Sequence, residues 1–149
     1  MISEERTFTV PGTPQGKGRP RATSFNGHAR VYTPNKTAAY ENLVALAYSA
    51  KYGKSPRFEG SVSVVIKAFF PYVQSDYWPK NKNHDGELRE EALSKKMLKK
   101  PDIDNVAKAV LDGLNQAGVW ADDSQVTYLQ CHKDYCTSPH LFVSVEGEV

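Results

Sequence analysis

Residues 61–70 read Ser-Val-Ser-Val-Val-Ile-Lys-Ala-Phe-Phe and form the most strand-prone stretch of the chain. Gly60 precedes this stretch and Pro71 ends it, as turn-forming residues commonly bound a strand. Successive strand side chains point to opposite faces, and apolar residues occupy both alternating sets of positions. One set contains Val62, Val64 and Ile66, and the other contains Val65 and Phe69. This pattern predicts an interior strand of a sheet.

On the N-terminal side of this strand the apolar residues follow helical spacing. Thr33 and Pro34 suit the N-cap and first position of a helix that we expect to run to about Tyr52. Its apolar positions are Tyr40, Leu43, Val44, Ala47 and Tyr48. Residues 7–10 alternate polar and apolar side chains before Pro11 and Gly12, which predicts a first strand.

On the C-terminal side, residues 71–86 are expected to be irregular, and a short charged helix is expected over about 86–98. The apolar stripe Val106, Ala107, Val110, Leu111 and Leu114 predicts a helix over about 104–116, capped by Gly118. Residues 125–135 and 140–145 are predicted to be two antiparallel strands. We therefore expect one α+β domain over 1–149, with a mixed β-sheet flanked by helices.

The overall composition is that of an ordinary globular domain. The 149 residues include 19 Lys+Arg and 17 Asp+Glu, which gives a net charge of +2 and excludes a histone-like polycation. No run approaches the ~20 apolar residues of a membrane-spanning helix. The acidic start of the chain, at Glu4 and Glu5, lacks the apolar core of a secretion signal. We expect a cytoplasmic protein with no membrane attachment.

The two cysteines, Cys131 and Cys136, are expected to be reduced thiols. Five residues apart in a strand, they would point to opposite faces and could not bridge directly. His132 and His140 lie nearby, but the spacing is wider than that of recognised zinc motifs. We assign no metal to this segment.

The segment Lys100-Pro101-Asp102-Ile103-Asp104-Asn105 is the most informative for chemistry. If it is extended, Asp102 and Asp104 share a face while Ile103 turns toward the core. Two carboxylates so close repel each other unless a cation lies between them, and Mg²⁺ prefers such oxygen ligands. The alternative is that these aspartates cap the following helix, although one acid suffices for that role.

Two further groups are candidates for the same chemistry. Lys108 lies one helical turn after Asp104 and one turn before Asp112, so it could be an ordinary helix salt bridge or a cation that contacts phosphate. Asp122 and Asp123 precede a predicted strand and could form a plain turn. A helix over 104–116 is about 20 Å long, so its two ends can share a site only if the chain returns.

A cationic loop, Gly16-Lys17-Gly18-Arg19-Pro20-Arg21, lies near the N-terminus and contains no acidic residue. We expect it to be mobile, and Arg30 and Lys36 add charge to the same end. It lacks the phosphate-binding P-loop pattern. Flexible cations of this kind suit the phosphate backbone of nucleic acid, and a solvated surface loop is the alternative.

Together these segments resemble the RusA family of Holliday junction resolvases, particularly those carried by phages and prophages. The matching segments cover most of the chain in the order of the family: Gly16 to Arg21, Tyr32-Thr33-Pro34, Lys100 to Asn105, Lys108-Ala109, Leu111-Asp112-Gly113-Leu114, Ala121-Asp122-Asp123-Ser124-Gln125-Val126 and Lys133. The segment from Tyr72 to Lys99 is longer than in the compact members of the family.

The resemblance implies a homodimeric, Mg²⁺-dependent endonuclease that cuts four-way DNA junctions by paired symmetric nicks during recombination and repair. Mn²⁺ could substitute for Mg²⁺, no small-molecule cofactor is implied, and the products would carry 5′-phosphate and 3′-hydroxyl ends. By motif position, Asp102, Asp104 and Asp123 would be the metal-holding catalytic acids, Lys108 the catalytic lysine, and Asp122 a weaker acid. Junction contacts would come from Lys17, Arg19, Arg21 and Lys133.

Two other functions are open at this stage. The chain could be a catalytically silent protein that binds branched DNA, but such a protein has no reason to cluster three aspartates beside phosphates. It could also be a metal-dependent nucleotide hydrolase, for which the basic loop would be superfluous.

Overall fold

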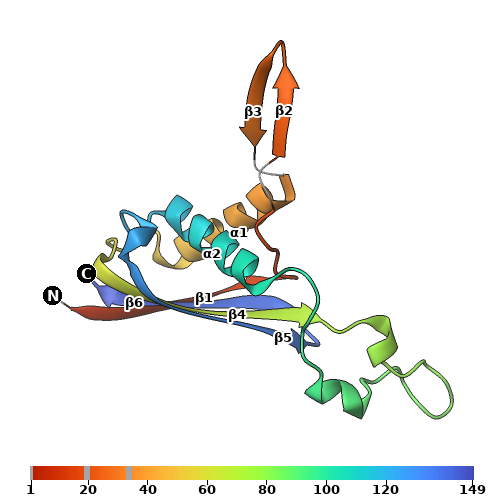
Figure 1. The fold of residues 1–149 in the computed structure, drawn as a ribbon. Helices are drawn as coiled ribbons and strands as arrows, with labels where there is room; N and C mark the ends of the chain where they lie inside the picture. Colours follow the sequence, from red (N-terminus) through yellow and green to blue (C-terminus); the bar gives the residue numbers. More distant parts are fainter. Residues whose placement is uncertain (1, 19–20, 33–34) are drawn as a thin grey trace.

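The computed structural model describes residues 2–18, 21–32 and 35–149, and it shows a four-stranded sheet with two helices on one face (Figure 1). The strand order is β1-β6-β4-β5, and these strands span Ser3–Pro11, His140–Glu148, Glu59–Pro71 and Val126–Cys136. β6 pairs antiparallel with both β1 and β4, whereas β4 and β5 are parallel. The prediction of an interior strand at 61–70 in a mixed α+β sheet is confirmed.

The core lies between this sheet and the helices α1 (Asn35–Tyr52) and α2 (Ile103–Ala117). Alternate side chains of β4 face the helices and are buried: Val62, Val64, Ile66, Ala68 and Phe70. Gly118 ends α2 in the left-handed conformation, with φ of 73°, as predicted. The two helices cross closely at Gly113, where a Cβ atom would lie 2.7 Å from Cβ of Val44.

The two C-terminal strands run antiparallel but are not neighbours. β4 lies between β5 and β6 and pairs with both. β5 therefore forms one edge of the sheet, and β1 forms the other. This strand order decides which chain segments lie beside α2.

The cationic N-terminal segment is more structured than the sequence suggested. β2 (Arg21–Phe25) and β3 (His28–Tyr32) form an antiparallel hairpin that extends away from the sheet and helices (Figure 1). Asn26 and Gly27 form its turn with φ of 51° and 78°, and Asn-Gly is a strong signal for such a turn. The cationic loop predicted at 16–21 therefore leads into a hairpin that the sequence analysis did not predict. The predicted helix start at Thr33-Pro34 and the position of Arg19 lie outside the described residues.

The segment between β4 and α2 contains no charged helix over 86–98. It has only two short 3₁₀ helices, η1 (Gln74–Asp76) and η2 (Glu90–Ser94). Asp76 organises the segment because its nearly buried carboxylate accepts hydrogen bonds from Lys95 Nζ, at 3.0 Å to each oxygen, and from the Val73 amide at 3.0 Å. Lys95 has an extended backbone that ends η2, which explains why the helix stops there.

Candidate active site

Asp102 and Asp104 lie at the N-terminal end of α2. Asp102 is the N-cap residue with extended backbone, and Asp104 lies in the first turn. The Asp102 carboxylate makes no capping hydrogen bond; it instead accepts a hydrogen bond from Lys100 Nζ at 2.8 Å, which holds the pKa of Asp102 below its ordinary value. Both aspartates are exposed, so two carboxylates are available to a ligand.

The expected orientation of Ile103 was wrong. Its side chain is 44% exposed and does not enter the core. The reason is that α2 begins at Ile103, so only Asp102 is extended and the alternation of an extended segment does not continue to Asp104. The two acids therefore occupy the N-cap and the first turn of a helix and do not lie on one strand face.

Lys133 holds the segment that carries these acids. From β5 its ammonium group donates to the carbonyl oxygens of Lys99, at 2.9 Å, and Pro101, at 2.8 Å. The sequence suggested a DNA contact for Lys133, and the structure adds contacts with two carbonyl groups beside Asp102. Nothing in the sequence pattern links Lys133 to these carbonyls, because the contact depends on β5 lying next to α2.

The loop before the hairpin packs against the same end of α2. The Lys17 amide donates to the Asn105 carbonyl oxygen at 2.8 Å, and a Cβ atom at Gly16 would lie 2.5 Å from Cβ of Pro101. Lys17 Nζ lies 2.7 Å from Glu41 Oε1 and 2.9 Å from Asp112 Oδ2. Burial opposes the charged form of Lys17, but these two carboxylates outweigh it and raise the pKa of Lys17.

Lys108 is exposed on α2, one turn after Asp104. The ion pairs found among the described residues do not include Lys108, and Asp112 pairs with Lys17 instead. The helix ladder of Asp104, Lys108 and Asp112 is therefore not formed. The Lys108 ammonium group remains available to an anion beside the aspartates.

Asp122 and Asp123 lie at the other end of α2. Asp122 caps the short helix η3 (Asp123–Gln125), and its side chain accepts a hydrogen bond from the Ser124 amide at 3.2 Å. The Ser124 side chain and this amide together lower the pKa of Asp122, the side chain contributing most. Asp123 Oδ2 accepts a hydrogen bond from Asn115 Nδ2 at 3.3 Å. Asn115 also accepts a hydrogen bond from the indole of Trp120, which is buried. The sequence reasoning missed Asn115, because only the fold places it beside Asp123.

One copy of the chain does not bring the three aspartates together. Asp123 lies beside Asn115, to which it is hydrogen-bonded. At about 1.5 Å per residue, α2 rises by about 16 Å from Asp104 to Asn115. Carboxylates that share one or two metal ions must be much closer, since paired ions lie about 3.5–4 Å apart. In the described ranges no group of three His, Cys, Asp or Glu side chains could hold a metal ion.

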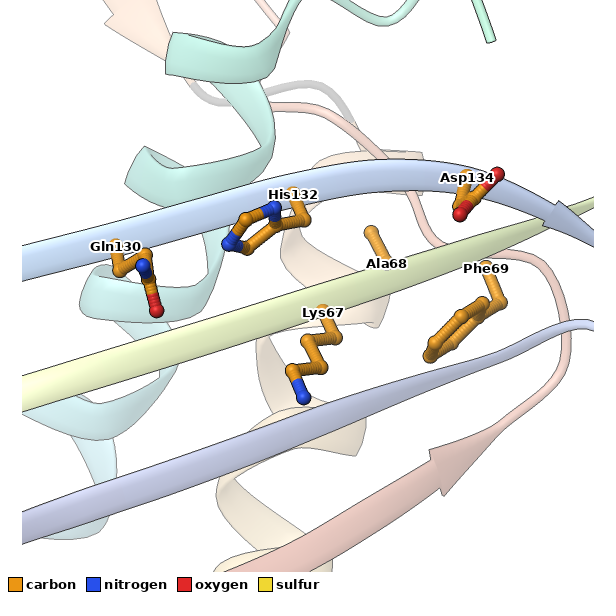
Figure 2. Close-up of a pocket in the computed structure, with 6 residues that line it drawn as sticks. All are labelled: Lys67, Ala68, Phe69, Gln130, His132 and Asp134. Carbon is orange, nitrogen blue, oxygen red and sulfur yellow. The ribbon is translucent and has the colours of Figure 1, made fainter. Parts of the chain in front are cut away.

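A hollow of about 430 Å³ lies elsewhere, on the face of the sheet away from the helices (Figure 2). Its lining includes Lys67, Phe69, Gln130, His132 and Asp134 from β4 and β5. The three aspartates lie at the ends of α2 and line no part of it. We therefore place the candidate active site at the helix ends.

The remaining predicted residues are located as follows. Arg21 begins β2 at the base of the hairpin, and Arg19 lies outside the described residues. Cys131 and Cys136 are both free, and burial raises the pKa of Cys131 to about 11. Within residues 2–18, 21–32 and 35–149, no helix has the length and apolar character needed to span a membrane.

Comparison with known proteins gives two matches. The family described as endodeoxyribonuclease RusA matches residues 11–146. A protein of Bacillus subtilis (strain 168), named "Uncharacterized protein YqaN", is 34% identical over 141 residues, which cover 93% of each chain. The family match includes every aspartate and lysine considered above.

Proposed function

Because this chain belongs to the RusA endodeoxyribonuclease family, we propose that it is a Mg²⁺-dependent, homodimeric nuclease that resolves four-way DNA junctions by paired symmetric nicks. One observation carries the catalytic part of the proposal. Asp102 and Asp104 present exposed carboxylates at the start of α2, and the side chain of the N-cap residue Asp102 makes no capping hydrogen bond. A structural role in capping therefore does not account for both acids.

The donor set fits a hard divalent cation. Asp102, Asp104 and Asp123 supply only carboxylate oxygens, which suit Mg²⁺ and also Mn²⁺. When bound by these residues, the ion supplies polarisation of the scissile phosphate and activation of the attacking water. Asp102, like any ordinary aspartate, is ionised at neutral pH, and the hydrogen bond from Lys100 lowers its pKa further.

Lys108 has a separate role in this proposal. Its exposed ammonium group, one turn after Asp104, can contact a phosphate oxygen and stabilise the negative charge that develops there during hydrolysis. Lys133 positions the segment of Asp102 through its bonds to Lys99 and Pro101. DNA affinity would come from the cationic segment before and within the hairpin, to which Arg19, Arg21 and Arg30 belong.

The separation along α2 supports a site that is shared between two copies of the chain. In the proposed dimer, Asp102 and Asp104 of one copy meet Asp123 of the other, so a two-fold dimer contains two complete sites. Two sites related by a two-fold axis suit two nicks placed symmetrically across a branch point. In this arrangement a single copy can bind DNA but cannot complete the acidic site.

A nicking assay tests the function. The protein is incubated with labelled four-way junction, linear duplex of the same sequence, and nucleoside triphosphates, each with Mg²⁺ or EDTA. We expect paired nicks in the junction alone, lost with EDTA and in Asp104→Asn, but kept in Asp134→Asn, which changes an exposed aspartate outside the site. Junction binding without nicking, or triphosphate turnover with intact junction, would overturn the proposal.

Mixed dimers test how the acids are shared. Asp104→Asn and Asp123→Asn chains with different tags are co-expressed, and the mixed dimer is isolated through both tags. Shared sites leave one complete site in the mixed dimer, so we expect single nicks from it and none from either homodimer. If one copy held a whole site, the mixed dimer would be inactive.

A further inference from the structure

The segment between β4 and α2, which we call the arm, comprises residues 72–99, all within the described ranges. Its longest helix, η2, has five residues, and its buried side chains are Asp76, Ala92 and Met97. Connections longer than about 15 residues that lack secondary structure of their own are usually either functional or disordered. The contacts within the arm decide between these two explanations.

An aromatic stack orders the outer half of the arm. The Arg89 guanidinium carbon lies 3.9 Å from the centroid of the Trp78 ring, and the His84 ring stacks on the indole at 4.2 Å. Two groups packed this closely on one flat ring cover its opposite faces. The Trp78 amide also donates to the Glu87 carbonyl oxygen at 2.8 Å, and residues 77–88 fold back on themselves as a narrow ribbon.

The tip and the base of the arm are fixed as well. At the tip, Asn81 Oδ1 accepts hydrogen bonds from the amides of Asn83, at 2.8 Å, and His84, at 3.0 Å. At the base, Tyr72 stacks on Tyr135 of β5 with ring centroids 5.2 Å apart, and the η1 carboxylate pairs with the lysine that ends η2. The arm is thus ordered, and little further entropy is lost when a partner binds it.

The side chains of four lysines are not used to hold the arm together. Lys80 and Lys82 lie at the tip of the ribbon, and Lys96 and Lys99 lie where the chain returns to α2. All four are exposed, and the ion pairs among the described residues include none of them. Their ammonium groups are available to an anion.

The acids of the arm lie between these two groups of lysines in the sequence. From 92 to 101 the chain contains no Asp or Glu, so the return segment is wholly cationic. Glu87 pairs with His84 inside the ribbon. The exposed acids of the arm without such a partner are Asp85, Glu90 and Glu91.

The arm leads directly into the candidate active site. It extends beyond the end of β4, and its return segment runs into Asp102 at the start of α2 (Figure 1). Lys99 is three residues before Asp102, which is at most about 11 Å of chain. Residues 77–82 add about 16 Å at about 3.3 Å per residue, which is about half a turn of B-DNA. The free lysines are therefore spaced along a length that suits a duplex and exceeds one phosphate.

We infer that the arm is a second DNA-binding element, whose tip contacts backbone phosphates of a duplex branch away from the position of the nick. A DNA backbone fits because its negative charge repeats along a line, as the lysines do, and because such contacts need no particular base sequence. The inference rests on the proposed function for the identity of the ligand as branched DNA. It adds the arm to the hairpin, which projects to a different side of the molecule (Figure 1).

Salt titrations of binding test the contact separately from nicking. Labelled four-way junction is bound with Ca²⁺ in place of Mg²⁺. Lys80→Ala/Lys82→Ala should raise the dissociation constant about tenfold or more at about 0.15 M salt. It should also reduce the slope of log binding constant against log salt concentration by about two for each arm that contacts DNA. Lys54→Ala/Arg57→Ala, the matched control, removes two exposed cations between α1 and β4 and should leave both quantities unchanged.

A variant of the stack tests whether the arm binds as a rigid element. Trp78→Ala keeps every lysine but frees Arg89 and His84, so junction affinity should fall severalfold because binding must then order the ribbon. Trp78→Phe retains a flat ring and should restore most of the affinity. Far-ultraviolet circular dichroism and melting temperature establish that each variant is folded. Wild-type affinity in Trp78→Ala would overturn the rigid contact.

A cleavage reagent attached to the tip locates it on the DNA. In a Cys131→Ser/Cys136→Ser background, Lys82→Cys is coupled to an iron chelate that generates hydroxyl radicals. The bound junction should be cut in its duplex branches about 5–8 base pairs from the nick, since the tip lies about 16–27 Å of chain from Asp102 and each base pair rises about 3.4 Å. Lys54→Cys carrying the same reagent should give no such cuts.

The outcomes separate the arm from the nuclease. Wild-type binding by Lys80→Ala/Lys82→Ala, or reagent cuts at the branch point alone, would overturn the arm contact. If junction nicking persisted in those cases, the proposed function would stand without the arm. Reagent cuts in the duplex branches of a junction that the protein never nicks would keep the arm contact and remove the nuclease function.

Discussion

Lys17 Nζ lies 2.9 Å from Asp112 Oδ2, and the same ammonium group contacts Glu41. This arrangement joins the loop before the hairpin to both helices. It also changes the interpretation of Lys17, which the sequence presented as a free cation for DNA. A side chain that is 17% exposed between two carboxylates contributes first to the folded structure.

We expect Lys17→Met to destabilise the protein by about 2 kcal/mol, because Glu41 and Asp112 then face each other without a cation. Urea unfolding at pH 7 measures the change. Lys54→Met, at an exposed lysine after α1, should have little effect. If Lys17→Met left the stability unchanged and reduced the salt dependence of junction binding, Lys17 would be a DNA contact as the sequence suggested.

Lys108→Ala should lower the single-turnover nicking rate about 10²-fold or more, because it removes the donor that we propose stabilises the developing phosphate charge. Junction affinity, measured with Ca²⁺ in place of Mg²⁺, should change little. Lys54→Ala is the matched control for the rate. A large loss of affinity with an unchanged rate for bound junction would make Lys108 a DNA-binding residue instead.

Lys133→Met should loosen the segment before α2, because the carbonyl groups of Lys99 and Pro101 lose their common donor. Amide hydrogen exchange should rise at residues 102–106, and the free energy of unfolding should fall by about 1–3 kcal/mol. Lys67→Met, on the open sheet face, is the control. Two results together would make Lys133 a direct phosphate contact. Amide hydrogen exchange would be unchanged, and the slope of log binding constant against log salt concentration would fall by about one.

Asp76 should make a pH-dependent contribution to stability. The hydrogen bond from Lys95 lowers the pKa of Asp76 below its ordinary value of 3.8. Its contribution is therefore fully present above that value and is lost as the pH falls through the lowered pKa in the folded state. Melting temperatures from pH 7 to pH 2 should show wild type and Asp76→Asn converging at the acid end. Parallel curves would contradict this assignment.

Gly113→Ala should cost about 1–3 kcal/mol, because the new methyl group would lie 2.7 Å from Cβ and 2.8 Å from Cγ1 of Val44 where α1 and α2 cross. The double variant Gly113→Ala/Val44→Ala should show a stabilising coupling energy in a thermodynamic cycle. A neutral Gly113→Ala would mean that the helices separate freely at this point.

Most of the individual elements could be predicted from the sequence. The spacing of apolar residues predicted β4, α1 and α2, because an element that buries one face carries apolar residues at regular intervals along the chain. The hairpin also has a local signal, because Asn26-Gly27 is typical of a hairpin turn, although it lies just after the cationic loop in a segment with little apolar alternation. The prediction of a helix at 86–98 was wrong, because Lys95 is hydrogen-bonded to Asp76. This contact joins residues far apart in the sequence and cannot be read from a local pattern.

The sequence by itself determined which residues we propose for the chemistry: the motifs that contain Asp102, Asp104, Lys108 and Asp123 resemble those of the family. Only the tertiary structure decided how they are arranged. Strand order placed Lys133 beside Pro101 and left β5 at an edge. The rigid length of α2 kept Asp123 at the opposite end from Asp104, since a helix fixes the distance between its ends whatever residues stand there.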